Sequence, residues 1–128
     1  MLRGSIVLSA GKWLRDTQQE IVMTHTISSS AEFEQFLKNH PVALIDFTAT
    51  WCGPCQMLKP VLAQVAQTHD GVAAVDVDAN SDIAQRFGIQ SVPTMIFFRN
   101  GKPVDALVGV APKPMIEKKL GAVAAAAV

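Results

Sequence analysis

The stretch VALIDFTATWCGPC, residues 42–55, decides the fold of this 128-residue chain. Its first part, Val42–Phe47, is apolar at odd and even positions alike except at Asp46, which is typical of a strand covered on both faces. The apolar residues that follow the stretch recur at helical spacing, at Leu58, Val61, Leu62, Val65 and Ala66. The segment Trp51–Cys55 is therefore predicted to lie where a buried strand meets an amphipathic helix.

Cys52 and Cys55 have the spacing of a local redox switch. On the first turn of a helix, such a pair brings both sulfurs within bonding reach, so dithiol and disulfide can interconvert without moving the rest of the fold. The positive end of the helix favours the thiolate of Cys52, which we expect to be the nucleophile. Cys55 lies deeper in the helix and should resolve the mixed disulfide. Gly53 lets a substrate backbone approach, and Pro54 stiffens the first turn.

Asp46 is an acidic residue in the middle of the predicted buried strand. An ionised carboxylate is costly to bury, so the pKa of Asp46 should be raised, and a carboxyl that titrates near neutrality can transfer protons. We expect it to lie beneath the cysteine motif and to accept the proton of Cys55, directly or through a water. The alternative is a strand-end aspartate that points into solvent or caps a turn.

Composition argues against several other classes of function. Eleven Lys and Arg residues balance eleven Asp and Glu residues. The chain therefore lacks the excess of positive charge that is typical of nucleic-acid-binding proteins. No apolar run reaches the length of a membrane span, about 18 residues. The two cysteines are only three positions apart, so a disulfide between them cannot link distant segments of the chain. The three histidines are scattered and lack the ligand spacing of a zinc site. We therefore expect no metal and no cofactor.

Strands and helices alternate along the rest of the chain. Apolar runs predict further strands at Met23–Ile27, Val72–Val77, Met95–Phe98 and Val104–Val108. The last two flank Asn100-Gly101, a dipeptide suited to a tight hairpin turn, so these strands should be antiparallel neighbours. The pattern predicts one α/β domain, residues 23–128, with a mixed sheet between helices.

Three helices besides the one after the motif are predicted from caps and apolar stripes. The first begins at Ser29 or Ser30 and stops near His40, because Pro41 disfavours helical geometry at the residue before it. A short helix is capped by Asn80 or Ser81 and ends at Gly88. The last carries an apolar stripe at Ile116, Leu120, Val123 and Ala127.

Residues 1–22 differ from the rest of the chain. Arg3, Lys12 and Arg15 occur among small and apolar residues, and no acidic residue precedes Asp16. This charge pattern is typical of an organellar presequence. The segment is therefore interpreted as an N-terminal extension that directs the protein to mitochondria. The alternative is a disordered extension on a cytoplasmic protein.

In combination, these motifs resemble the thioredoxin family. The resemblance covers residues 23–128 and rests on Asp46-Phe47, Trp51-Cys52-Gly53-Pro54-Cys55, Pro60, Val92-Pro93-Thr94, Phe98-Arg99-Asn100-Gly101 and Gly109. It implies the thioredoxin fold, an α/β architecture in which four helices flank a five-stranded mixed sheet. It also supports Asp46 as the buried proton acceptor and implies a redox disulfide between Cys52 and Cys55.

The resemblance further implies a flat apolar surface where partner proteins dock. Its residues would be Trp51, Val92, Pro93, Gly109 and Val110. Pro93 would be cis and face the cysteines, and the backbone of Val92 would pair with an extended segment of the partner.

Two positions depart from the family pattern. Thr48 stands where many members carry a second tryptophan, so packing beside the motif is expected to be looser. Ala74 stands where many members carry a lysine near the buried acid. Without that ammonium, we expect the pKa of Asp46 to be higher still, and the deprotonation of Cys55 to be more sensitive to pH.

The resulting hypothesis is a monomeric general protein-disulfide reductase that maintains cell redox homeostasis. Its partners would be disulfide-containing client proteins and a thioredoxin reductase or another dithiol donor. An oxidase or isomerase of a secretory compartment is less favoured, because the sequence shows neither a secretory signal nor a histidine within the motif. A binding module that uses its docking face independently of redox chemistry is the alternative from another class.

Overall fold

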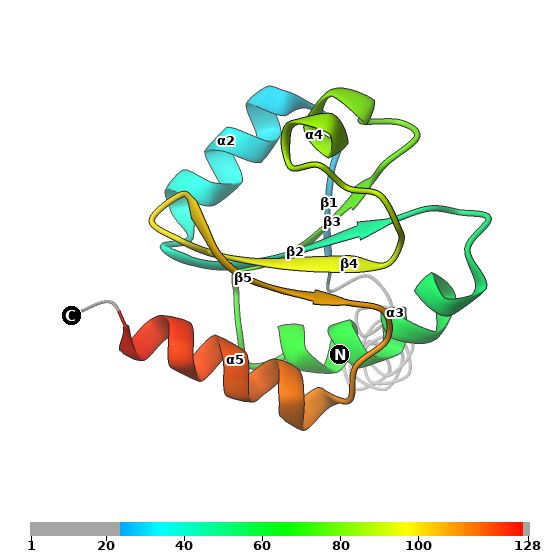
Figure 1. Cartoon of the computed structure of the whole chain (residues 1–128). Helices are drawn as coiled ribbons and strands as arrows, with labels where there is room; N and C mark the ends of the chain where they lie inside the picture. Colours follow the sequence, from blue (N-terminus) through cyan, green and yellow to red (C-terminus); the bar gives the residue numbers. More distant parts are fainter. Residues whose placement is uncertain (1–23, 127–128) are drawn as a thin grey trace, which may run out of the picture.

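One mixed sheet of five strands organises the structure, a computed structural model that describes residues 24–126 (Figure 1). The strands are β1 (His25–Ile27), β2 (Val42–Thr48), β3 (Val72–Asp76), β4 (Thr94–Arg99) and β5 (Lys102–Val108). They lie in the order β1-β3-β2-β4-β5. β3 is parallel to both β1 and β2, whereas β4 is antiparallel to β2 and β5.

Four helices in the described range cover the two faces of the sheet. They are α2 (Ser30–Asn39), α3 (Gly53–Ala66), α4 (Ser81–Arg86) and α5 (Lys113–Ala125). In Figure 1, α2 and α4 lie on one side of the sheet and α3 and α5 on the other. The predicted α/β fold is thus confirmed. The predicted extension, residues 1–22, lies outside the described residues.

The ends of most elements follow from their local chemistry. α2 begins at Ser29, whose hydroxyl accepts a hydrogen bond from the backbone N–H of Glu32 at 3.1 Å. It ends before Pro41, as the sequence predicts. At the hairpin between β4 and β5, Asn100 and Gly101 both have positive φ, +51° and +81°, which the tight turn requires. α3 continues through Pro60, which lies inside the helix.

Strand bounds differ from the predictions by a few residues. β1 is shorter than predicted within the described residues, and β4 and β5 each extend closer to the hairpin. Pro103 lies inside β5, which is an edge strand, so its missing N–H removes no ladder bond that the sheet needs. Pairing with β4 therefore extends the strand beyond its apolar run.

Side chains of β2 alternate between the two faces. Ala43, Ile45 and Phe47 join a buried cluster with residues of α2 and α4, including Phe33, Phe36, Leu37 and Ile83. Leu44 joins the cluster on the opposite face, which includes Leu58 and Leu62 of α3 and Ile116, Leu120 and Val123 of α5. Each large apolar side chain buried in this way contributes about 1.5–3 kcal/mol. Ala127 of the predicted stripe lies outside the described residues.

Gly71 allows β3 to approach β2 closely. A Cβ atom at this position would overlap the carbonyl oxygen of Val42, so no other residue fits without a backbone shift. The carbonyl of Gly71 accepts a hydrogen bond from the N–H of Leu44 at 2.6 Å. Beyond this contact, β2 and β3 are paired in parallel, and their register places Asp46 opposite Ala74.

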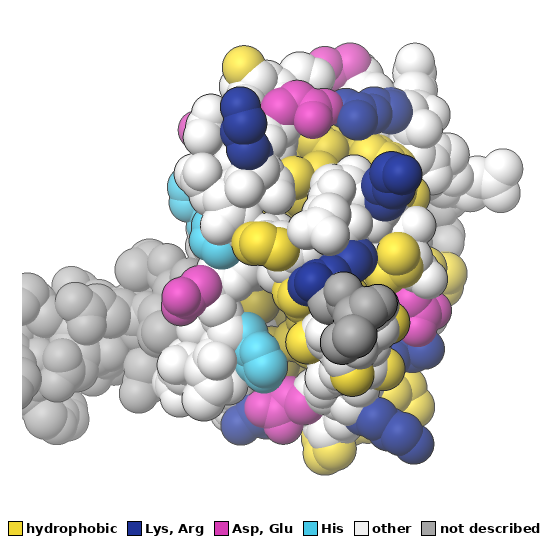
Figure 2. Space-filling model, turned by 90° about the vertical axis from the view of Figure 1, so that its left-hand side faces the viewer, with side chains coloured by type: hydrophobic (Ala, Val, Ile, Leu, Met, Phe, Trp, Pro, Cys, Tyr) yellow, Lys and Arg dark blue, Asp and Glu magenta, His cyan; other side chains and the backbone are white. Residues whose placement is uncertain are grey.

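Charged side chains are dispersed over the molecule. Figure 2 shows the end of the sheet opposite the cysteine motif, where basic and acidic side chains are interspersed. This distribution agrees with the equal numbers of basic and acidic residues. None of the helices within residues 24–126 is long and apolar enough to cross a bilayer.

Candidate active site

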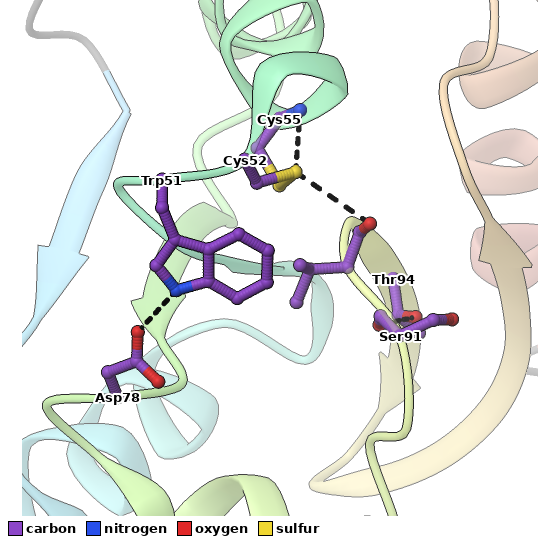
Figure 3. Close-up of a disulfide and its surroundings, with 7 residues drawn as sticks. Trp51, Cys52, Cys55, Asp78, Ser91 and Thr94 are labelled. Atoms are coloured by element: carbon purple, nitrogen blue, oxygen red, sulfur yellow. Dashed lines mark hydrogen bonds between the residues drawn. A yellow bond between two sulfur atoms is a disulfide. The ribbon is translucent and has the colours of Figure 1, made fainter.

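Cys52 and Cys55 form a disulfide at the N-terminus of α3 (Figure 3). Cys52 is the N-cap residue, and its sulfur accepts a hydrogen bond from the backbone N–H of Cys55 at 3.1 Å. The two Cα atoms lie 5.3 Å apart. An amide and the positive end of a helix therefore both face the sulfur of Cys52, and each stabilises negative charge on it.

The disulfide is largely shielded from solvent. Cys52 is 4% exposed and Cys55 is fully buried, and both pack with Ala49 and against Val77 and Val92. Cys55 is thus the deeper of the two, and the side chain of Cys52 is itself almost completely covered. Gly53 and Pro54 form the exposed side of the motif, and no atom would obstruct a Cβ at Gly53.

The loop before β4 lies against the disulfide. The peptide bond between Val92 and Pro93 is cis, and the Val92 carbonyl oxygen lies 3.7 Å from the sulfur of Cys52. Pro93 is buried, and its carbonyl accepts a hydrogen bond from the N–H of Gly109 at 2.8 Å. The loop after β5 is thereby held beside the cis peptide bond.

The five residues expected to form a docking surface differ in exposure. Trp51 is 70% exposed and Val110 is 45% exposed, whereas Val92 and Gly109 are partly buried and Pro93 is buried. Trp51 is held in place because its indole N–H donates a hydrogen bond to Asp78 at 2.7 Å (Figure 3). An amphipathic indole fixed in this way offers a large apolar surface to a partner.

Asp46 is buried on the face of the sheet that α3 covers. It is 1% exposed, and within residues 24–126 its Oδ1 atom has no hydrogen-bond partner. Burial raises the pKa of Asp46 from 3.8 to about 7, while the charge of Lys59 lowers it. The aspartate therefore does not point into solvent or cap a turn. Its carboxyl can gain or lose a proton near neutral pH.

No metal centre is apparent in the part of the chain that the structure describes. Within residues 24–126, no three His, Cys, Asp or Glu side chains come together as ligands.

Comparisons with known proteins decide the family. The sequence matches the family model described as Thioredoxin over residues 24–122. The chain belongs to the thioredoxin family. It is 46% identical over 89 residues to a thioredoxin of Chlorobaculum thiosulfatiphilum, a match that covers 67% of this chain and 82% of that protein.

Solved structures agree with this assignment to the thioredoxin family. A mutant thioredoxin from Halobacterium salinarum NRC-1 has a TM-score of 0.75 at 34% identity, covering 78% of this chain and 89% of that one. Oxidized mitochondrial thioredoxin 3 from Saccharomyces cerevisiae has a TM-score of 0.72 at 28% identity. This match covers 80% of the present chain and 98% of the yeast chain. The protein is accordingly a thiol–disulfide reductase that acts through Cys52 and Cys55, and it requires disulfide substrates and a reductase.

Two residues of this thioredoxin-family site were missed by sequence reasoning. The charge of Lys59, on α3, lowers the pKa of Asp46. Position 74 on β3, where many family members carry a lysine, is an alanine here. The expectation that no ammonium lies near the acid is therefore wrong. Asp78, which holds Trp51, directly follows the predicted strand at Val72–Val77. Its position at the end of the strand parallel to β2 was the available signal.

Proposed function

We propose that Cys52 is the attacking sulfur of the reductase and that Cys55 is the resolving sulfur. The thiolate of Cys52 attacks one sulfur of a client disulfide, the client disulfide breaks, and a mixed disulfide forms as the first client thiolate leaves. The observation that carries this assignment is the position of Cys52 as the N-cap of α3, with the N–H of Cys55 directed at its sulfur. The full burial of Cys55 supports the second role.

The resolving step needs a base for the thiol of Cys55, and we assign this role to Asp46. The thiol gives its proton to the carboxylate, directly or through a water, and the resulting thiolate attacks the sulfur of Cys52. The bond between Cys52 and the client breaks, the internal disulfide forms, and the second client thiolate leaves. Burial of Asp46 and its pKa of about 7 support this assignment, because the group is half-ionised near neutral pH.

A trapping experiment tests the order of attack. With insulin as the disulfide substrate, Cys55→Ser should accumulate a covalent complex through Cys52 that dithiothreitol reverses. Cys52→Ser should form no such complex, and both variants should lose turnover. Mass spectrometry of the adducts makes the distinction. If the Cys52→Ser variant instead formed a stable adduct at Cys55, as fast as Cys55→Ser forms its adduct at Cys52, the two roles would have to be exchanged.

Client proteins are proposed to dock on a surface made by Trp51, Val92, Pro93, Gly109 and Val110. Trp51 and Val110 supply exposed apolar area, and the backbone of Val92 lies beside the sulfur that reacts. An extended client segment that pairs with Val92 would bring its disulfide to Cys52. Val110→Ala should raise KM for insulin, whereas Val104→Ala, an exposed valine near the hairpin, is the matched control and should not.

Recycling by an NADPH-dependent thioredoxin reductase is the proposed source of electrons. A coupled assay with such a reductase and insulin measures it directly, and the absence of NADPH oxidation would point to another dithiol donor. We also propose that the protein works as a monomer, which sedimentation at working concentration tests.

A mitochondrial location is proposed for the mature protein. The basic residues among residues 1–22 and the absence of acids before Asp16 support it, as does the structural similarity to a mitochondrial thioredoxin of yeast. Mass spectrometry of the native N-terminus together with cell fractionation tests this proposal. A native chain that keeps Met1 and remains in the cytoplasm would overturn it.

A further inference from the structure

Thr48, the last residue of β2, carries a buried hydroxyl group that the fold leaves unused. The residue is 8% exposed, and its Oγ1 atom has no hydrogen-bond partner within residues 24–126. A buried hydroxyl in this state lowers the stability of a fold. The protein with its disulfide closed therefore holds a donor at the end of β2 that no described group accepts from.

The alternation of side chains along β2 directs Thr48 to the face that α3 covers. Ile45 and Phe47 pack on the side of α2 and α4, whereas Leu44 packs on the side of α3 and α5. Because successive side chains point to opposite faces, Asp46 and Thr48 share the face of Leu44. Thr48 is the one of these that lies nearest the end of the strand from which the cysteine motif follows.

The direction of α3 places Cys55 above this part of β2. The helix connects two parallel strands, so it runs back along β2 in the opposite direction (Figure 1). The charge of Lys59 on this helix acts on Asp46. From Asp46 to Thr48 the strand advances about 7 Å, the length of about four to five helical residues. Counted back along the helix from Lys59, that step leads to Cys55.

Two immediate neighbours of Thr48 pack with the cysteines. Ala49, the next residue, is buried in one cluster with Cys52 and Cys55, and Val77 packs against that cluster. The backbone N–H of Val77 donates a hydrogen bond to the carbonyl oxygen of Thr48 at 2.9 Å. The buried hydroxyl and the fully buried Cys55 are therefore neighbours in the same part of the core.

The charged groups around this part of the core are mostly acidic. Asp46 lies on the same strand, and Asp76 of β3 is paired with Thr48, so its side chain lies on the same face. The Oδ1 atom of Asp76 already accepts two backbone N–H bonds from the following turn, at 2.8 and 3.0 Å. Lys59 is the basic group from α3, and the residue on the β4 side, Pro93, carries no charge. A hydrogen bond from a neutral hydroxyl would thus offset part of the repulsion that an ionised Cys55 meets.

We propose that the hydroxyl of Thr48 donates a hydrogen bond to the sulfur of Cys55 once the disulfide has opened, and that it stabilises the thiolate that resolves the mixed disulfide. The inference rests on the proposed role of Cys55 as the resolving sulfur. The thiol of Cys55 gives its proton to Asp46, and the thiolate accepts the hydrogen bond from Thr48 and attacks the sulfur of Cys52. The bond between Cys52 and the client breaks, and the client thiolate leaves with its electron pair. The hydrogen bond is then lost, because a neutral disulfide sulfur is a weak acceptor.

The variant Thr48→Val tests this role, because valine has nearly the shape of threonine without the hydroxyl. Acid quenching of a single turnover with insulin, followed by mass spectrometry, records the mixed disulfide as it forms and decays. We expect Thr48→Val to slow its decay about tenfold at pH 7, the effect of one lost hydrogen bond to a charged group, with formation unchanged. The pH–rate profile of the decay should move to higher pH.

Two further variants serve as controls in the same measurement. Thr48→Ser keeps the hydroxyl and should retain most of the decay rate. Thr68→Val makes the same chemical change at an exposed site just after α3 and should leave both steps as they are.

The equilibrium with a glutathione redox buffer provides a second readout. The unpartnered hydroxyl is a cost that the disulfide form carries, so its removal should shift Thr48→Val toward the disulfide, by about fivefold in the equilibrium constant. Thr48→Ser and Thr68→Val should stay close to the unaltered protein. A role in packing alone would affect both redox forms and leave this equilibrium where it is.

The outcomes separate the failure of this inference from that of the proposed function. If Thr48→Val behaves like Thr68→Val in both measurements while Cys55→Ser still accumulates the mixed disulfide, only the role of Thr48 is overturned. If Cys55→Ser accumulates none, Cys55 is not the resolving sulfur, and both proposals fail. If Thr48→Val does not fold, Thr48→Ala is compared with Thr48→Ser: slower decay in the alanine variant supports the role, and equal rates overturn it.

Discussion

The two faces of the sheet differ in how their buried polar groups are treated. On the side of α2 and α4, aromatic rings fill the core, and Phe98 meets Phe33 edge to face at 5.9 Å. The buried Asn80 donates hydrogen bonds to the carbonyl oxygens of Asp76 and Ile27 at 3.1 and 3.4 Å. On the side of α3, Asp46 and Thr48 each keep a buried oxygen with no partner within residues 24–126.

This difference in hydrogen bonding shows which face of the sheet contains groups that lower the stability of the fold. Unpartnered buried polar groups destabilise a fold. Here they are confined, among the described side chains, mainly to the face that carries the disulfide, where a group with an altered pKa can take part in proton transfer. Within residues 24–126, the opposite face keeps no buried side-chain oxygen without a hydrogen-bond partner. We therefore expect substitutions on the two faces to separate stability from chemistry.

The largest effect on stability is expected from Phe98→Ala. Its ring is fully buried on the α2 side, so removal should lower the free energy of unfolding by about 3–5 kcal/mol. The reductase rate constant of the folded protein should hardly change. Phe97→Ala, the neighbour on the α3 side, is the control and should cost similar stability. Urea unfolding and insulin reduction measure both, and a slower rate constant in Phe98→Ala would contradict the separation of the faces.

Asp46 should make the oxidised protein less stable as pH rises. The pKa is about 7 in the folded chain against 3.8 ordinarily, so between these values the folded state holds more protons than the unfolded state. Stability contributed by the neutral carboxyl is present at low pH and is lost as pH rises through 7, about 4 kcal/mol in all.

Asp46→Asn isolates this pH dependence from that of other groups. The difference in unfolding free energy between the two proteins should grow in favour of the asparagine variant between pH 4 and pH 8. Urea unfolding of the oxidised proteins measures it. A difference that stays constant over this range would show that the carboxyl is not held neutral by burial.

A smaller effect is expected from Lys59→Gln. The lysine charge lowers the pKa of Asp46, so its removal should raise that pKa, by less than burial does because burial is the larger cause. Lys59→Arg keeps the charge and should restore the original titration. NMR of the carboxyl carbon follows the midpoint in each variant, and equal midpoints in the glutamine and arginine variants would exclude the charge effect.

The smallest effects should come from two exposed ion pairs, one beside each face. Lys119 contacts Asp105 at 2.8 Å and links α5 to β5, so Lys119→Ala should cost at most about 1 kcal/mol. Arg86 pairs with Glu34 and also lies 5.0 Å from the ring centre of Phe87. Arg86→Ala should therefore cost more than Lys119→Ala. Unfolding at low and high salt compares them, and equal losses would discount the ring contact.

Local patterns predicted most of the fold. The doubly apolar strand, the cap at Ser29 and the Asn100-Gly101 turn each depend on residues close together in sequence, and all three are found as predicted. Strand ends were less accurate, because pairing with a neighbour extends a strand beyond its apolar run. β5 begins at Lys102, two residues before the predicted start, where it pairs with Arg99.

The surroundings of the site were less predictable than its residues. Lys59 lies on α3 and Asp46 on β2, and the packing of the helix on the sheet brings the charge near the carboxyl. The shielding of Cys52 likewise depends on a loop 40 residues away, whose Val92 carbonyl lies beside the sulfur. Such features follow from tertiary packing, which periodicity and spacing do not encode.

Gly71 gives the activity a dependence on a residue that takes no part in it. Its lack of a side chain lets β3 settle against Val42, and a slip of one residue between these strands would turn each side chain of the slipped strand to the opposite face. A replacement at this position would thus be felt at the sulfurs, although it touches neither.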